Sequence, residues 1–245
     1  MTNLAIDIGN TRAKLGLFQG ENLVDKVVWP EWGVKDFSTY TTNHTVESVI
    51  LSSTAGSKAE ELDDFLRSRF RYLKLDHLTP LPIRNTYKTP ETLGKDRLAA
   101  VVGAQALFPE KTCLVIDAGT CITLDVLESG TTFLGGNISP GLDMRLNAMH
   151  TFTAALPRVE KGPFGGWIGD RTETALRNGA QWGALLEIEG MISLAREHFG
   201  EIIVILTGGD ADFLANQLKS EIFAASDLVL QGLNKILIHN VKHLA

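Results

Sequence analysis

Two short stretches of this chain share one pattern: an apolar run, an aspartate, a glycine two residues later, a threonine, and a second apolar run. The first copy spans residues 4–15 and the second spans residues 114–127. Each copy predicts a strand, a tight turn and a returning strand, because glycine and polar residues occupy the bend. Two related units in one chain indicate duplication, with two half-domains facing each other across a cleft.

The residue types in these turns suit the binding of polyphosphate with a divalent ion. A glycine at the bend lets main-chain N–H groups approach an anion, because no Cβ intervenes. In the first turn Thr11 adds a hydroxyl, Lys14 a cation, and Asp7 a carboxylate suited to a hydrated metal ion. A hairpin with an Asx-type turn explains the first copy equally well when it is taken alone. The second copy, with Asp117 and Thr120, favours phosphate binding from both halves.

Composition excludes several broad classes of function. The 245 residues suit one large domain or two small ones, with 44% hydrophobic and 21% charged residues. A formal net charge of -6 argues against general affinity for nucleic acid. No signal peptide is evident, and no apolar run approaches the ~20 residues needed to cross a bilayer. We therefore expect a cytoplasmic protein without membrane partners, with Cys113 and Cys121 as reduced, buried thiols.

Hydrophobic periodicity predicts an alternation of strands and helices along the chain. The first half reads β-β-β-α-β-α-β, with elements at 23–29, 34–45, 48–52, 58–70 and 72–75 after the first hairpin, followed by an extended connector at 79–92. The second half adds a strand at 133–138, a helix at 141–151 started by Pro140, and a loop at 156–169 long enough to form a flap. A helix from Thr172 breaks near Gly179 and resumes at 180–198, and a strand at 202–206 and a helix at 228–244 complete the chain. This order is typical of α/β architecture.

Asp96 precedes a run of helix-forming residues at 98–107. The simplest interpretation is a helix N-cap. A second interpretation is a carboxylate beside Arg97 that accepts a proton from a substrate hydroxyl. The two roles are compatible, and the residues alone leave both open.

Taken together, these segments resemble the type III pantothenate kinases, within the superfamily of acetate and sugar kinases, heat-shock chaperone ATPases and actin. The resemblance runs nearly end to end, through DIGNTRAK (7–14), YKTPETLGKDR (87–97), DAGTCITLD (117–125), GGNISPGL (135–142), TAALP (153–157), IGDRTETALRNGAQWG (168–183) and TGGDA (207–211). Each fragment is weakly specific by itself. Their order and spacing are highly specific, because sugar kinases of the superfamily lack the GKDR and PGL segments in this arrangement.

The resemblance implies an α/β fold of duplicated ribonuclease-H-like domains, the actin-like ATPase fold, with a central cleft. We expect an N-terminal half at residues 1–111 and a C-terminal half with a terminal helix at residues 112–245. Related enzymes are homodimers with substrate sites at the subunit contact. Residues 180–198 are therefore the candidate interface helix, with packing inside the chain as the alternative.

The implied reaction is ATP-dependent phosphorylation of pantothenate to 4'-phosphopantothenate, the first step of coenzyme A biosynthesis, with Asp96 as the general base. The implied ATP-binding residues are Asp7, Ile8, Gly9, Asn10, Thr11, Arg12, Ala13, Lys14 and Thr120. Those implied for pantothenate are Tyr87, Gly94, Lys95, Asp96, Arg97 and Thr172. Asp117 corresponds to the carboxylate ligand of a monovalent cation, K⁺ or NH4⁺, and Asp7 is the candidate ligand of Mg²⁺ through water.

Two other functions are compatible with the same fold. One is a catalytically inactive ATP-binding protein with a regulatory or accessory role. The joint presence of Asp7, Asp96, Arg97 and Asp117 favours an active enzyme instead. The other is a kinase that acts on a sugar or on acetate, against which the connector with Tyr87, the GKDR loop and the short chain all argue.

Overall fold

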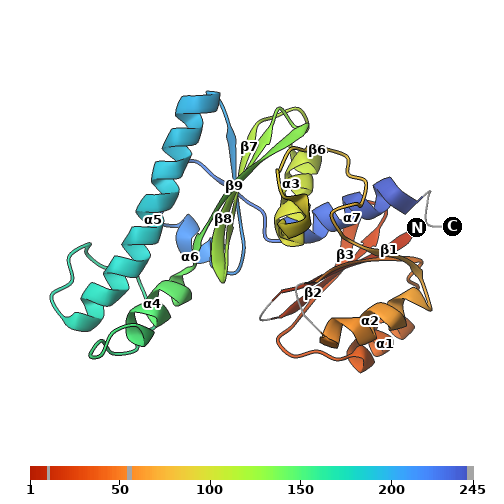
Figure 1. Ribbon diagram of the computed structural model, residues 1–245, viewed down its shortest axis with the longest axis horizontal. Helices are drawn as coiled ribbons and strands as arrows, with labels where there is room; N and C mark the ends of the chain where they lie inside the picture. Colours follow the sequence, from red (N-terminus) through yellow and green to blue (C-terminus); the bar gives the residue numbers. More distant parts are fainter. Residues whose placement is uncertain (10–11, 54–56, 242–245) are drawn as a thin grey trace. The chain divides into compact units, whose positions relative to one another are not determined.

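The computed structural model describes residues 1–9, 12–53 and 57–241, and its chain divides into two compact units (Figure 1). The first unit comprises Met1–Glu110, Glu128–Leu134 and Asp227–Ala245, and the second comprises Lys111–Leu127 and Gly135–Ser226. Each unit is described by itself below. In the described part of the chain, no helix has the length and apolar character that a membrane span needs.

The first unit is built on a five-stranded sheet with the order β3-β2-β1-β4-β5. Its elements are β1 (Thr2–Ile8), β2 (Ala13–Gln19), β3 (Asn22–Trp29), α1 (Val34–Asn43), β4 (Ser48–Ser53), α2 (Ser57–Arg67), β5 (Arg71–Lys74), β6 (Arg84–Asn85), the 3-10 helix η1 (Pro90–Thr92), α3 (Lys95–Leu107) and α7 (Leu228–Asn240). β1 pairs antiparallel with β2 and parallel with β4. This order, in which β2 alone is reversed, is that of a ribonuclease-H-like domain and confirms the predicted β-β-β-α-β-α-β succession.

The central strand β1 is buried on both faces. Leu4, Ile6 and Ile8 join the apolar cluster beneath α1 and α2. Ala5 between them is also fully buried, on the opposite face, against which α7 packs. Burial on both faces explains why β1 reads as a continuous apolar run rather than an alternating one.

The second unit repeats the same strand order. Its strands lie in a six-stranded sheet with the order β11-β10-β7-β8-β9-β6, of which the first five match the order of the first sheet; β7 pairs antiparallel with β8 and parallel with β10. The elements are β7 (Cys113–Ala118), β8 (Cys121–Glu128), β9 (Thr132–Pro140), α4 (Leu142–Thr151), α5 (Thr172–Phe199), β10 (Ile203–Thr207), α6 (Ala211–Ala215) and β11 (Phe223–Ala224). β7 and β8 therefore correspond to β1 and β2, which confirms the duplicated ribonuclease-H-like fold.

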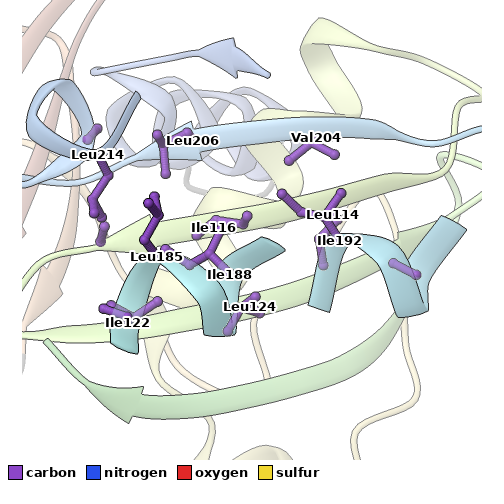
Figure 2. Close-up of a cluster of buried hydrophobic side chains, with 14 of the residues drawn as sticks. Leu114, Ile116, Ile122, Leu124, Leu185, Ile188, Ile192, Val204, Leu206 and Leu214 are labelled. Carbon is purple, nitrogen blue, oxygen red and sulfur yellow. The ribbon is translucent and has the colours of Figure 1, made fainter. Parts of the chain in front are cut away.

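Helix α5 covers one face of this second sheet, as Figure 2 shows. Leu185, Ile188 and Ile192 point from α5 toward side chains of β7, β8 and β10, such as Ile116 and Leu124. Each of these five side chains is at most 3% exposed. The apolar stripe of α5 thus holds the strands that carry the second acidic turn.

Several predicted element boundaries are wrong in detail. The break near Gly179 does not exist, because α5 is continuous over 28 residues. A glycine inside a helix costs only about 1 kcal/mol relative to alanine, which burial of flanking residues such as Leu176 and Ala180 outweighs. Pro140 ends β9 and does not start a helix, because Gly141 is the N-cap of α4. The connector at 79–92 contains β6, which pairs with the first residues of β9, and the short elements α6 and β11 were not predicted.

Contacts group α7 with the first unit, although the chain reaches it last. α7 packs against α3 and β1, all within that unit. The boundaries expected for the two halves, 1–111 and 112–245, differ from those of the compact units. The division of the chain into two repeats at these boundaries stays a prediction.

The contact between α3 and α7 depends on two glycines. A Cβ on Gly232 would lie 1.8 Å from the carbonyl oxygen of Ala99, and one on Gly103 would lie 2.4 Å from that of Leu228. Both obstacles are backbone atoms, so the helices would have to separate to admit a methyl group.

We expect Gly232→Ala to lower the free energy of unfolding by about 1–3 kcal/mol, because the added methyl group overpacks the contact between helices. Gly179→Ala in α5 is the matched control, since nothing lies within 4 Å of the added Cβ. That control should be neutral or stabilise by up to about 1 kcal/mol. Urea unfolding measures both variants, and equal midpoints would contradict the assigned packing.

Candidate active site

The first acidic turn connects β1 to β2. Asp7 pairs in register with Lys14 on β2 and with Ser52 on β4, so these three side chains share one face of the sheet. Ser52 is 2% exposed, and its Oγ donates to Asp7 Oδ1 at 3.1 Å. The carboxylate is thereby oriented at the end of the central strand.

The turn itself is closed by a hydrogen bond from the Gly9 N–H to the Arg12 carbonyl oxygen at 3.1 Å. A Cβ on Gly9 would meet nothing nearer than 3.9 Å, so the space beside its backbone is open. Ile8 and Ala13, which flank the turn, are buried in the core and pair with each other across β1 and β2. Two other predicted ATP-binding residues, Asn10 and Thr11, lie outside the described residues.

The second acidic turn connects β7 to β8 and reproduces the first. The Gly119 N–H donates to the Cys121 carbonyl oxygen at 2.9 Å. Asp117 lies one residue before the end of its strand, as Asp7 does, and its parallel partner is Thr207 of β10. Thr207 is 2% exposed, like Ser52, its counterpart in the first unit. The duplication thus extends to a buried hydroxyl residue beside each aspartate.

The glycine motif after β10 lies directly against the second acidic turn. Gly208 has a φ of +101°, and a Cβ there would lie 2.2 Å from the Ala118 carbonyl oxygen and 2.4 Å from Asp117 Oδ1. The Asp210 N–H donates to the same Ala118 carbonyl at 2.8 Å. The carboxylate of Asp117 therefore lies over the backbone of Gly208, where no side chain could fit.

The Gly- and Pro-rich segment at 156–169 is held by α4, α5 and the turn before α6. Lys161 Nζ forms ion pairs with Asp210 at 2.5 Å and with Asp143 at 3.3 Å. Burial favours a lower pKa for Lys161, but the hydrogen bonds and charges of Asp210 and Asp143 outweigh it and raise this pKa. The Gly162 N–H donates to Gln181 Oε1 at 3.0 Å. The flap role suggested by the sequence stays a prediction.

The predicted substrate residues Tyr87 and Arg97 meet in the first unit. The Tyr87 ring stacks on the Phe133 ring, with centroids 6.2 Å apart. The Arg97 guanidinium lies over the Tyr87 ring, 5.6 Å from its centroid. Arg97 is 5% exposed. The pairing of β6 with β9 explains the stack, because it places Asn85, two residues before Tyr87, directly opposite Phe133.

Asp96 is not the N-cap of its helix. Gly94 occupies that position, α3 begins at Lys95, and Asp96 is the second helical residue. Its Oδ1 accepts the Arg97 N–H at 2.8 Å. The N-cap interpretation is therefore wrong, because the helix starts two residues earlier than the apolar pattern indicated. Thr172 of the second unit is the first residue of α5 and is exposed.

Sequence reasoning did not single out Ser52 or Lys161 as site residues, and it included Thr207 only as the first residue of the TGGDA segment. Ser52 and Thr207 could have been found, because Ser52 is the last residue of a predicted strand and Thr207 directly follows one, and ligands of α/β folds bind at such strand ends. No sequence signal marks Lys161, which is one lysine in the Gly- and Pro-rich segment at 156–169. Among the described residues, no three His, Cys, Asp or Glu side chains form a group that could hold a metal ion by themselves.

Comparison with known proteins identifies the family. A model of the type III pantothenate kinases matches residues 3–194. The chain belongs to the type III pantothenate kinase family. It is 42% identical over 243 residues to the type III pantothenate kinase of Christiangramia forsetii, covering 97% of this chain and 98% of that one. It is 44% identical over 238 residues to that of Bacteroides fragilis, with the same coverage.

A solved structure supports the fold independently. The activator of 2-hydroxyisocaproyl-CoA dehydratase from Clostridium difficile, solved with bound ADPNP, aligns with a TM-score of 0.56 at 13% identity, over 99% of this chain and 96% of that one. At that identity the likeness shows the fold alone. The chain thus shares the actin-like ATPase fold.

We expect Gly208→Ala to lower the melting temperature by several degrees, because a positive φ and a backbone contact both oppose a side chain there. Gly209→Ala is the matched control, since nothing lies within 4 Å of its Cβ. Thermal unfolding without ligand compares the two variants. A control variant less stable than Gly208→Ala would contradict the assigned packing of the glycine motif.

Proposed function

We propose that this protein transfers the γ-phosphoryl group of ATP to the primary hydroxyl of pantothenate. The product is 4'-phosphopantothenate, and the reaction opens coenzyme A biosynthesis. The observation that carries the proposal is the match to type III pantothenate kinases at 42–44% identity over 97% of the chain. This chain also has all four residues that the proposed chemistry requires, namely Asp7, Asp96, Arg97 and Asp117.

The two acidic turns are the proposed phosphate sites. In each, a glycine N–H closes the turn, and the backbone beside that glycine is open to a ligand. The other main-chain N–H groups of such a turn can bind phosphate oxygens without requiring specific side chains. Ile8 and Ala13, which are buried, would hold the first turn in place, while Lys14 and Thr120 would contribute side chains.

Asp96 is the proposed general base. It would accept the proton of the pantothenate hydroxyl, or orient that oxygen for in-line attack. Because the transition state of phosphoryl transfer is loose, positioning accounts for much of the rate. Arg97 would bind the carboxylate or another polar oxygen of pantothenate, since a guanidinium held against Tyr87 is already oriented. Gly94, Lys95 and Thr172 complete the proposed set.

The donor atoms at the two aspartates fit hard cations. Mg²⁺ would be held through water at Asp7, whose carboxylate is oriented by Ser52. A monovalent cation, K⁺ or NH4⁺, would be held at Asp117, beside the backbone of Gly208. Both ions would neutralise phosphate charge when bound. Assays that omit each ion in turn test this assignment.

A homodimer through α5 is also part of the proposal. Opposite its buried face, α5 exposes Leu186 by 64% and Leu194 by 59%, with Gly190 between them. Residues spaced by four lie on one helix face, and a glycine between two leucines allows close approach of a second helix. Sedimentation of the Leu186→Glu variant tests this contact, and a mass equal to that of the unsubstituted protein would exclude α5 as the interface.

A cytoplasmic location remains a prediction, which cell fractionation tests.

The direct test is identification by mass of the product that the purified protein makes from pantothenate and ATP. We expect 4'-phosphopantothenate, with little turnover of glucose or acetate under the same conditions. Equal turnover of glucose would refute the substrate assignment. Nucleotide binding without turnover of any acceptor would support the alternative of an inactive regulatory protein.

We expect Asp96→Asn to lower kcat by ~10²-fold or more while pantothenate binding stays largely intact, because the amide cannot accept the proton. Asp64→Asn is the matched control, since Asp64 is an exposed carboxylate on α2 of the same unit. Steady-state kinetics with both substrates measure the effect. Normal turnover by the Asp96 variant would remove this residue from the mechanism.

A further inference from the structure

The junction between β9 and α4 lies against the second acidic turn. The Gly141 N–H donates to the Thr120 carbonyl oxygen at 3.1 Å. A Cβ on Gly141 would lie 2.1 Å from the Gly119 carbonyl oxygen and 2.5 Å from that of Thr120. The peptide between Pro140 and Gly141 therefore supports both residues at the bend.

The same peptide group is held at its other end by Arg145. Arg145 Nε donates to the Pro140 carbonyl oxygen at 2.8 Å. That carbonyl and the Gly141 N–H belong to one planar unit. A chain of hydrogen bonds thus runs from the guanidinium through this peptide to Thr120. A charged donor at the carbonyl polarises the peptide and strengthens the bond that its N–H makes.

The guanidinium is itself fixed from two further directions. Arg145 Nη2 forms an ion pair with Glu187 of α5 and donates to Ser139 Oγ at 3.4 Å. The side chains of Arg145 and Glu187 are only 20% and 30% exposed, so solvent screens the pair less than it screens a surface pair. Arginine suits this role because its planar fork can bind several acceptors at once.

We propose that Arg145 is a positioning residue for nucleotide binding at the second acidic turn. By fixing the Pro140–Gly141 peptide, it sets the course of the backbone through Gly119 and Thr120, and thereby the position of the Thr120 N–H and hydroxyl, to which phosphate would bind. This inference rests on the proposed function in one respect, namely that the turn binds the phosphates of ATP. The competing role is simple support of the packing between α4 and α5.

The test combines three variants with a matched control. Arg145→Met removes every polar contact of the guanidinium, and Arg145→Lys keeps the charge but loses the fork. Glu187→Gln keeps the arginine but weakens its anchor. Arg196→Gln is the control, because Arg196 also lies on a helix of this unit and donates to a side chain, Ser220 Oγ, at 3.3 Å. Calorimetric titration with ADP and hydrogen exchange at the Gly141 amide are the readouts.

We expect Arg145→Met to weaken ADP binding about tenfold or more and to speed exchange of the Gly141 amide, since a charged hydrogen bond is lost. Arg145→Lys and Glu187→Gln should have intermediate effects, and Arg196→Gln should have none. In turnover, the KM for ATP should rise while the KM for pantothenate stays within about twofold.

Unchanged ADP affinity together with a lowered melting temperature would overturn the proposal and leave Arg145 a purely structural residue. If Arg145→Met fails to fold, unchanged ADP affinity and Gly141 exchange in both milder variants would have the same consequence. Because neither readout uses pantothenate, failure of the substrate assignment leaves this test intact.

Discussion

The site depends on one arrangement of paired strands, which occurs once in each unit. A central strand carries an aspartate one residue before its end, and its antiparallel neighbour returns after a bend closed by a glycine N–H. Its parallel neighbour places a buried hydroxyl residue opposite that aspartate. Register fixes this geometry, because a shift by one residue would turn the carboxylate to the other face of the sheet. The buried apolar faces of β1 and β7 make such a shift costly.

Close approach of backbones is the second requirement. In the second unit Gly141 and Gly208 lie against the carbonyl groups of the turn at distances that exclude any Cβ. The N–H of Gly141 and that of Asp210 also donate to carbonyls of this turn. Segments far apart in the chain therefore hold the turn from two sides by main-chain contacts. A turn held in this way can present N–H groups to an anion with little reorganisation on binding.

Local sequence signals were reliable where a single element decides the outcome. The hairpins, the strand at β4 and the start of α5 at Thr172 follow from periodicity and turn residues. The local signals failed where tertiary packing outweighs intrinsic propensity. Gly179 does not interrupt α5, because the buried stripe of the helix continues across it. Asp96 has a good N-cap side chain, yet the helix begins before it, at Lys95.

The sequence by itself determined the duplicated acidic turns, the α/β class and the family, because these depend on residue types at fixed spacing along the chain. Only the tertiary structure decided that α7 packs in the first unit, that Arg97 lies on Tyr87, and that Arg145 and Lys161 anchor the surroundings of the second turn. These contacts join residues distant in the chain or bring side chains to backbone groups. No periodicity in one sequence encodes such distances, since they follow from how whole strands and helices pack.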